Sequence, residues 1–256
     1  MSNCQIKNAF TLAETLVTLG IIGIVASMTL PSLINKTQSK QLEAQFKKVY
    51  TELNQVAQLY KKDNGISITE AASENGTTIM IIHELLKYYK GASTIDNTIH
   101  NSVDNEGKKK SVRYNIYSMG GKKLRLGPCD DFGFFSEGGG RIYSFVRDPI
   151  QPGQEGPVVC VDINGFKGPN KYGYDIHVFY FTNHGYVYPM GQPHLNKTKY
   201  GGAEDASSSN FFYTGSAFCK YAQKVEYQMT CANYALQNKN PQGDGNYWQD
   251  FLGKNK

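Results

Sequence analysis

Residues 10–34 read FTLAETLVTLGIIGIVASMTLPSLI, and the only charged residue among them is Glu14. The uncharged part, residues 15–34, is about as long as a helix must be to cross the hydrocarbon core of a bilayer. Polar residues precede the segment, with Lys7 as their one cation, and the chain becomes polar again directly after Ile34. The segment therefore predicts an apolar N-terminal helix that is joined to a polar domain.

The residues by themselves leave three interpretations of this segment open. A cleaved secretory signal also has a cation before an apolar stretch, but cleavage after Ala26 would place the bulky Ile24 at a position that favours small residues. A plain membrane anchor explains the length and leaves Glu14 at the lipid headgroups, because a carboxylate in the apolar region costs a few kcal/mol. The third interpretation depends on the residues around Glu14.

The run AFTLAE at residues 9–14, together with Pro31, resembles the N-terminus of type IV prepilins and type II secretion pseudopilins. The resemblance implies that a prepilin peptidase cuts after Ala9 and that the new N-terminal residue, Phe10, is methylated. It also implies that Glu14 is the family's assembly glutamate and that Pro31 is its helix-kinking proline. Ala9 is a departure from the pattern, because most members of the family have glycine there.

The same resemblance divides the chain into a leader peptide (1–9), a transmembrane half-helix (10–34), an amphipathic half-helix (35–62) and an extracytoplasmic head (63–256). It implies a single-pass protein of the cytoplasmic membrane that later enters a periplasmic or cell-surface filament, as a minor pilin or pseudopilin. The expected partners are prepilin peptidase, copies of the chain and other pilin-like subunits, an inner-membrane assembly platform and membrane lipid.

Glu14 has a physical role under this interpretation. Cleavage after Ala9 would leave a cationic amine on Phe10, in a medium where a lone charge is costly. In a filament, the Glu14 carboxylate of one subunit can neutralise the amine of its neighbour, and removing one partner of a buried pair costs more than the pair is worth. Pro31 has no amide hydrogen, so we expect the helix to kink or melt locally there.

Beyond residue 34, apolar residues recur at spacings of three and four, which is typical of one face of a helix. The sequence Asp63-Asn64-Gly65 then favours a helix stop in the left-handed conformation. We therefore expect one helix over residues 10–62. Its second half should pack on the head through an apolar stripe formed by Leu42, Phe46, Val49, Leu53, Val56 and Tyr60.

The head is predicted to be α+β, with a mostly antiparallel sheet and a covering helix. The long N-terminal helix should pack on this sheet, in a pilin-like arrangement. Helices are expected at residues 79–89 and 218–237, and the sequence NHG at 183–185 favours a tight hairpin turn. Strands are expected at residues 111–119, 141–146, 157–163, 175–181 and 186–188.

Composition and motifs limit the class of protein. Of 256 residues, 40% are apolar, 12% aromatic and 19% charged, which excludes disorder throughout and multi-span membrane proteins. A net charge of +5 does not indicate a nucleic-acid partner. We interpret the lysines at 108–110 as solvated, and together with those at 122–123 they are only weak evidence for a DNA-contacting patch. Common hydrolase, metalloprotease and nucleotide-binding motifs do not occur, and Asp130-Asp131 and Glu137 lack a supporting pattern, so no enzyme activity is expected.

Residues 158–189 carry a second resemblance, through Asp-x-Asn-Gly, Gly-Pro-Asn and Gly-x-Asp, to a loop of prepilin-like secretion proteins. Independently of the resemblance, these turn-forming residues predict a loop of fixed shape between two strands. Asp162, Asn164 and Asp175 offer the oxygen ligands that calcium uses, and some pseudopilins bind calcium in a loop of the head. The spacing is not that of an EF-hand, so turn formation is the favoured hypothesis and calcium is the alternative.

Cys4 lies in the expected leader, and four cysteines remain in a part of the chain expected outside the cytoplasm, which favours two disulfides. The sequence by itself allows three pairings. The spacing of Cys219 and Cys231 resembles the C-terminal disulfide loop of many pilins, which implies that pair and leaves Cys129 for Cys160.

A secreted or membrane-anchored binding or adhesion module is the alternative from a different class. It would have a tyrosine-rich head and an ordinary signal peptide or anchor. Under this alternative the chain is not cleaved after Ala9, and Glu14 has no role in assembly. The position where the mature chain begins therefore separates the two interpretations.

Overall fold

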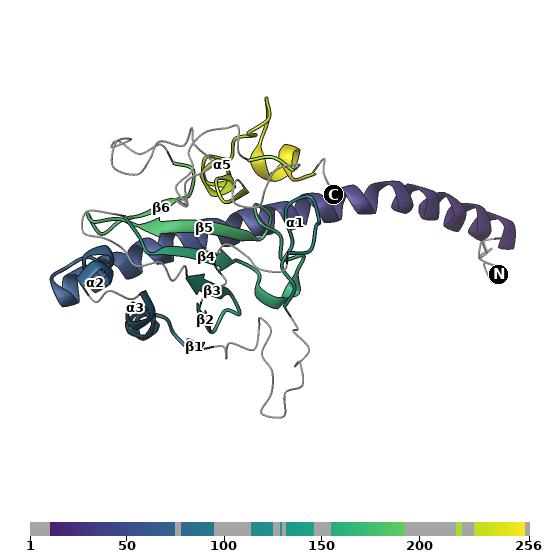
Figure 1. The fold of residues 1–256 in the computed structure, drawn as a ribbon. Helices are drawn as coiled ribbons and strands as arrows, with labels where there is room; N and C mark the ends of the chain where they lie inside the picture. The colour runs from purple at the N-terminus through teal and green to yellow at the C-terminus, as the bar shows by residue number, and fades with distance from the viewer. Residues whose placement is uncertain are drawn as a thin grey trace, which may run out of the picture.

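The computed structural model of the chain describes residues 11–74, 78–94, 114–124, 129, 132–145, 155–192, 219–221 and 228–253. One long helix, α1 (Leu12–Asn64), projects from a head in which an antiparallel sheet is combined with short helices (Figure 1). The fold is therefore α+β, with the long N-terminal helix packed against the sheet, as predicted.

The ends of α1 follow from its terminal residues. Thr11 caps the N-terminus, and Gly65 has a left-handed φ of 77° and donates its N–H to Lys61 O at 2.9 Å. A residue with a side chain is strained at such a φ, which explains why the helix stops at this glycine. The predicted helix and the observed helix differ by about two residues at each end.

Pro31 lies inside α1, and the helix is continuous through it. Local melting, one of the two outcomes expected at this proline, is therefore wrong. The projecting half of α1 instead bends away from the line of its packed half (Figure 1). A proline removes one hydrogen bond from the ladder, and a bend accommodates its ring without unwinding the helix.

The sheet is a meander in which each strand pairs antiparallel with the next along the chain. The strands predicted at 141–146, 157–163, 175–181 and 186–188 are confirmed. The strand predicted at 111–119 is wrong over its described part, 114–119, which forms only isolated bridges at Tyr117. The six strands are β1 (Ser93–Thr94), β2 (Phe132–Ser136), β3 (Ile142–Phe145), β4 (Val158–Asp162), β5 (Ile176–Phe181) and β6 (Val187–Pro189).

The shorter helices agree with the sequence in part. The helix predicted at 79–89 is present as α3 (Thr78–Leu85) followed by a 3-10 turn, η1 (Leu86–Tyr88), and α2 (Ile68–Glu74) precedes it. The helix predicted at 218–237 is wrong at its start, because residues 219–221 are not helical and α5 spans only Cys231–Gln237. A continuous helix would hold Cys219 and Cys231 about 18 Å apart, whereas their Cα atoms are 5.0 Å apart across a disulfide.

The sheet is buried on both faces, which is why every residue of β3, β4 and β5 is buried. Val159 and Val161 of β4 face the cluster that includes α1. Their neighbours Val158 and Cys160 face a second cluster, which is covered by Tyr114 and by other residues outside the sheet. The alternation of strand side chains thus produces two cores rather than one core and a solvated face.

All six residues of the predicted stripe on α1 are buried in the core that the helix shares with the sheet and the shorter helices of the head. The Phe46 ring is fully enclosed, with ring centroids 4.7 Å from His177, 5.5 Å from Phe179 and 5.5 Å from Trp248. Trp248 belongs to a short π-helical turn, η4 (Tyr247–Phe251), which packs on α1. This turn and the strands β1 and β2 were not predicted, since none of them carries a clear period in the sequence.

Two leucine-to-alanine substitutions compare how much the stripe and the exposed side of α1 contribute to stability. Leu53→Ala removes a side chain that is 1% exposed, and we expect a loss of about 2–5 kcal/mol in the free energy of unfolding. Leu59→Ala removes one that is 45% exposed, and the expected loss is below about 1 kcal/mol. Urea unfolding of the full chain in detergent, followed by the fluorescence of Trp248, measures both; equal losses would contradict this packing.

Candidate functional site

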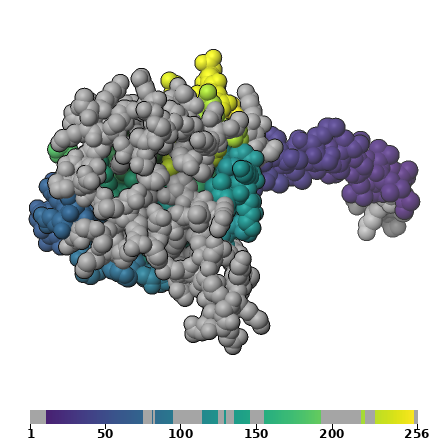
Figure 2. Space-filling model, viewed as in Figure 1, coloured from purple at the N-terminus to yellow at the C-terminus, as the bar shows by residue number. Residues whose placement is uncertain are grey.

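The N-terminal half of α1 is an apolar rod outside the head (Figure 2). It is long and apolar enough to cross a membrane, and no part of its apolar window is buried. Its large apolar side chains are at least half exposed: Leu12, Leu16, Val17, Leu19, Ile21, Ile22, Ile24, Val25, Met28, Leu30, Leu33 and Ile34. An apolar surface of this extent requires lipid or protein around it, and its position near the N-terminus suggests a membrane anchor or a signal sequence.

Glu14 closes the N-terminal end of this rod. Its Oε2 accepts hydrogen bonds from Thr11 N and from Thr11 Oγ1, both at 2.9 Å, and Thr11 Oγ1 accepts one from Glu14 N at 3.2 Å. This reciprocal pair is a capping box, which satisfies amide donors that the first turn of a helix leaves free. The Thr-x-x-Glu spacing of Thr11 and Glu14 is the sequence signal for this cap, and it was not among the predicted roles of Glu14. Ala9 and Phe10 lie outside the described residues, and their processing remains a prediction.

The loop between β4 and β5 contains the three candidate calcium ligands. Asp162 Oδ1 accepts hydrogen bonds from the N–H groups of Asn164 (3.1 Å) and Gly165 (2.8 Å), and Asp162 Oδ2 accepts one from the Tyr114 hydroxyl at 2.6 Å. Asp175 accepts from the N–H groups of Asn170, at 2.8 Å, and Lys171. All four carboxylate oxygens therefore hold the chain in place, as the turn-forming hypothesis expects.

Asn164 has a similar part in the loop, because its Nδ2 donates to Gly168 O at 3.0 Å. Among the described residues, no group of three or more His, Cys, Asp or Glu side chains could hold a metal ion. A calcium ion at Asp162, Asn164 and Asp175 would have to displace hydrogen bonds that already define the loop.

The two carboxyl groups of this loop are almost fully buried, Asp162 at 2% exposure and Asp175 at 0%. Burial raises the pKa of Asp175 to about 6, against the opposing effect of its backbone hydrogen bonds. Burial and the nearby charge of Asp175 raise the pKa of Asp162 well above its ordinary value. Because two like charges in one dry site repel each other, a proton on one of them stabilises the pair.

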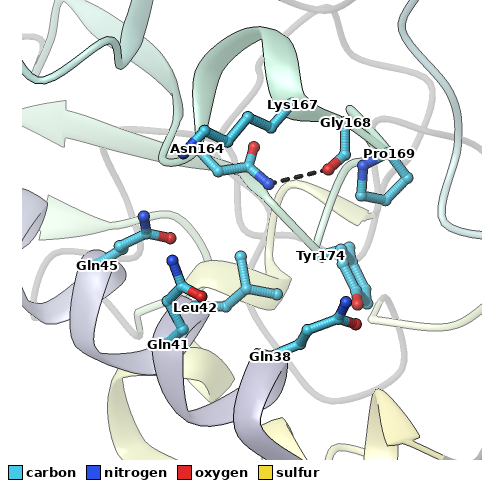
Figure 3. Close-up of a pocket in the computed structure, with 9 residues that line it drawn as sticks. All are labelled: Gln38, Gln41, Leu42, Gln45, Asn164, Lys167, Gly168, Pro169 and Tyr174. Carbon is cyan, nitrogen blue, oxygen red and sulfur yellow. Dashed lines mark hydrogen bonds between the residues drawn. The ribbon is translucent and has the colours of Figure 1, made fainter. Parts of the chain in front are cut away.

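A polar pocket of about 290 Å³ lies between this loop and α1 (Figure 3). Gln38, Gln41 and Gln45 project into it from successive turns of the helix, and Lys167 lies on the opposite side. The remaining lining residues are Leu42, Asn164, Gly168, Pro169 and Tyr174. No sequence pattern indicates this pocket, because its two walls are more than a hundred residues apart in the chain.

A buried ion cluster ties the same helix to the sheet. The Arg141 side chain is 8% exposed, and its Nη1 lies 2.6 Å from Glu52 Oε2 on α1 while its Nε contacts Glu137 Oε1. Glu137 was one of three carboxylates weighed as a catalytic group, and here it is the ion-pair partner of Arg141. The other two, Asp130 and Asp131, lie outside the described residues.

His177 is a core residue rather than a metal ligand. Its ring packs between those of Phe46 and Trp248, and burial lowers its pKa to about 3. Its Nε2 lies 3.2 Å from Tyr174 O, so a neutral ring can donate a hydrogen bond there.

Two disulfides are present, Cys129–Cys160 and Cys219–Cys231. These are the pairs that the resemblance implied. Cys160 lies on β4, so the first disulfide fixes Cys129 to the sheet face opposite α1. Disulfides persist in oxidising compartments, and they indicate that the head is extracytoplasmic.

No protein-family model, curated protein or solved structure matches this chain. The architecture is nevertheless pilin-like, because a long N-terminal apolar helix is followed by an antiparallel sheet on which its second half packs. The topology agrees with the class that residues 9–14 and Pro31 resemble.

The buried carboxyl pair predicts an unusual pH dependence. Because the pKa of Asp175 is raised to about 6 from 3.8, the folded chain keeps a proton that the unfolded chain has already released between these values. This contribution is fully present below pH 4 and is lost as the pH rises through 6. We expect the free energy of unfolding to fall by roughly 1–3 kcal/mol over that interval.

Urea unfolding at a series of pH values from 4 to 7 measures this dependence, and Asp175→Asn provides the comparison. The variant lacks the titrating group, so its profile should be flatter than that of the parent chain. Parallel profiles would contradict the assignment to Asp175. If the loop instead held calcium, adding the ion at pH 7 would raise the midpoint temperature of the parent chain and not that of the variant; we expect no such rise.

Proposed function

We propose that the chain is a structural subunit, a minor pilin or pseudopilin, of a type II secretion or type IV pilus-like filament. The observation that supports this most directly is the division of one continuous helix into two environments. Residues 15–34 carry no charge and are exposed on almost every side, whereas residues 42–60 bury a single stripe against the head. A helix of this kind can stand in lipid or in a bundle of its own kind while it carries a folded head.

The apolar surface of residues 12–34 suits both the membrane and the filament. In a membrane, an α-helix satisfies its own backbone hydrogen bonds and presents side chains to lipid. In a filament, the apolar halves of many copies can bury each other, with the heads outside. Gly20 and Gly23 have open space where a side chain would be, and small residues allow helices to approach closely.

Under this proposal prepilin peptidase cuts after Ala9, and the methylated Phe10 becomes the first residue. The Glu14 carboxylate, which caps its own helix in the single chain, neutralises the new amine of a neighbouring subunit. The partners are other copies, other pilin-like subunits and an inner-membrane assembly platform. The work of the protein is mechanical and involves no catalysis.

The position where the mature chain begins tests the proposal directly. Intact mass and N-terminal sequencing of the protein from its own membranes should give a chain that starts at methylated Phe10. A chain that starts near Ser27 would identify an ordinary signal peptide and a secreted binding module. A chain that still carries Met1 would identify a plain anchor, and Glu14 would lose its partner.

Two substitutions of Glu14 separate its capping role from its charge. Glu14→Gln keeps the capping box, since glutamine also bonds the N-cap amide, but removes the negative charge. Glu14→Ala removes both. If the charge neutralises a neighbouring amine, both variants should reduce filament yield strongly while the urea unfolding of the head stays unchanged. Normal assembly by Glu14→Gln alone would show that the cap, and not the charge, is required.

A further inference from the structure

The end of the head from which α1 projects lies close to the apolar half of the helix. Gln38, the first α1 residue that lines the pocket, follows Ile34 by four residues, or about 6 Å along the helix axis. The headgroup layer on each side of a bilayer is about 5–7 Å thick. If residues 12–34 lie in a membrane, as the proposed function requires, this end of the head faces lipid phosphates.

A short turn at this end exposes an aromatic ring beside a cation. The turn is η3 (Gly165–Lys167), in which Phe166 is 57% exposed and Lys167 is exposed. The Phe166 ring is held edge-on against Tyr114, with ring centroids 5.8 Å apart. Apolar rings next to lysines are typical of surfaces that rest in the headgroup region.

A second segment adds lysines to the same end. Tyr117 forms isolated bridges with Lys123 on one side and with Lys171 on the other, and its N–H donates to Asn170 O at 2.8 Å. This pairing places residues 116–124 beside the loop that carries Lys167. Figure 2 shows teal atoms, the colour of this segment, at the base of the projecting helix.

Together these residues form a surface that we call the basic end. Among the described residues, no carboxylate lies within ion-pairing distance of its lysines. The two carboxyl groups of the adjacent loop, Asp162 and Asp175, are buried and bonded to backbone N–H groups. The basic end consists of Phe166 and the lysines Lys122, Lys123, Lys167 and Lys171.

We propose that the basic end binds the phosphate headgroups of anionic lipids in the membrane that holds α1. Lysines supply the charge, the Phe166 ring enters the headgroup layer, and the pocket lined by Gln41 and Lys167 offers N–H donors to a phosphate. Each lysine near an anionic surface should shift the equilibrium between docked and free heads by about fivefold. The head would thus rest on the membrane until the subunit is extracted.

The test uses the full chain in nanodiscs of phosphatidylcholine, either alone or mixed with phosphatidylglycerol. Phe166→Trp introduces a fluorophore at the basic end, and the parent chain, whose only tryptophan is the buried Trp248, supplies the background. Lipids brominated near the headgroup should quench the new indole strongly in anionic discs and weakly in neutral ones. Raising the salt from about 0.1 to 1 M should abolish the difference, because the screening length falls from about 10 to 3 Å.

A pair of triple variants isolates the role of the lysines. In the Phe166→Trp background, Lys122→Gln/Lys123→Gln/Lys167→Gln should reduce the docked population at least fivefold. The control removes the same charge from exposed lysines elsewhere on the head and should leave quenching unchanged: Lys62→Gln/Lys87→Gln/Lys90→Gln.

Equal quenching in neutral and anionic discs, or equal effects of the two triple variants, would overturn lipid binding at the basic end. A blue shift that occurs only when copies associate, without quenching by lipid, would assign this surface to a second copy and also overturn it. If α1 inserts into the discs but quenching does not depend on the lipid charge, only lipid binding at the basic end fails, and the filament proposal stands. Failure of every variant to insert would show that α1 is not a membrane helix, and both proposals would fail.

Discussion

The burial of one stripe of α1 against the sheet is the constraint on which the rest of this structure depends. Phe46 lies near the N-terminal end of this stripe, in contact with rings from β5 and η4, and the stripe continues to Tyr60. Because the helix is continuous, fixing its second half on the head also fixes the direction in which the first half leaves it. The apolar rod is therefore presented at one end of the head (Figure 1).

Packing alone would leave α1 free to slide along the sheet by a turn, since an apolar stripe repeats. Polar contacts remove this freedom. Asn54 on α1 bonds both the N–H and the O of Val187, at 3.0 and 3.4 Å, and Arg141 holds Glu52, two residues earlier on the helix. A buried polar group that loses its partner is costly, so each of these contacts disfavours a shifted register.

Polar contacts also hold the loop between β4 and β5, which forms the other wall of the pocket. Asp162 and Asp175 are acceptors for backbone N–H groups, which would otherwise be buried without partners. Holding two carboxyl groups in a dry site raises the pKa of each, and this is the cost of a loop with a fixed shape. The fixed loop in turn sets where η3 and its exposed Phe166 lie relative to the helix.

The sequence by itself determined the elements whose signal is local. The apolar run of residues 12–34, the stripe from Leu42 to Tyr60 and four of the six strands follow from periodicity, and Gly65 marks the helix end. Tertiary structure alone decided what joins distant residues: the pocket between Gln38 and Lys167, the ion cluster of Arg141, and the packing of η4. Tertiary structure also shortened the helix expected at 218–237, because a disulfide that joins Cys219 to Cys231 cannot span three helical turns. Such contacts have no period in the sequence, since their energy arises only once the chain has folded.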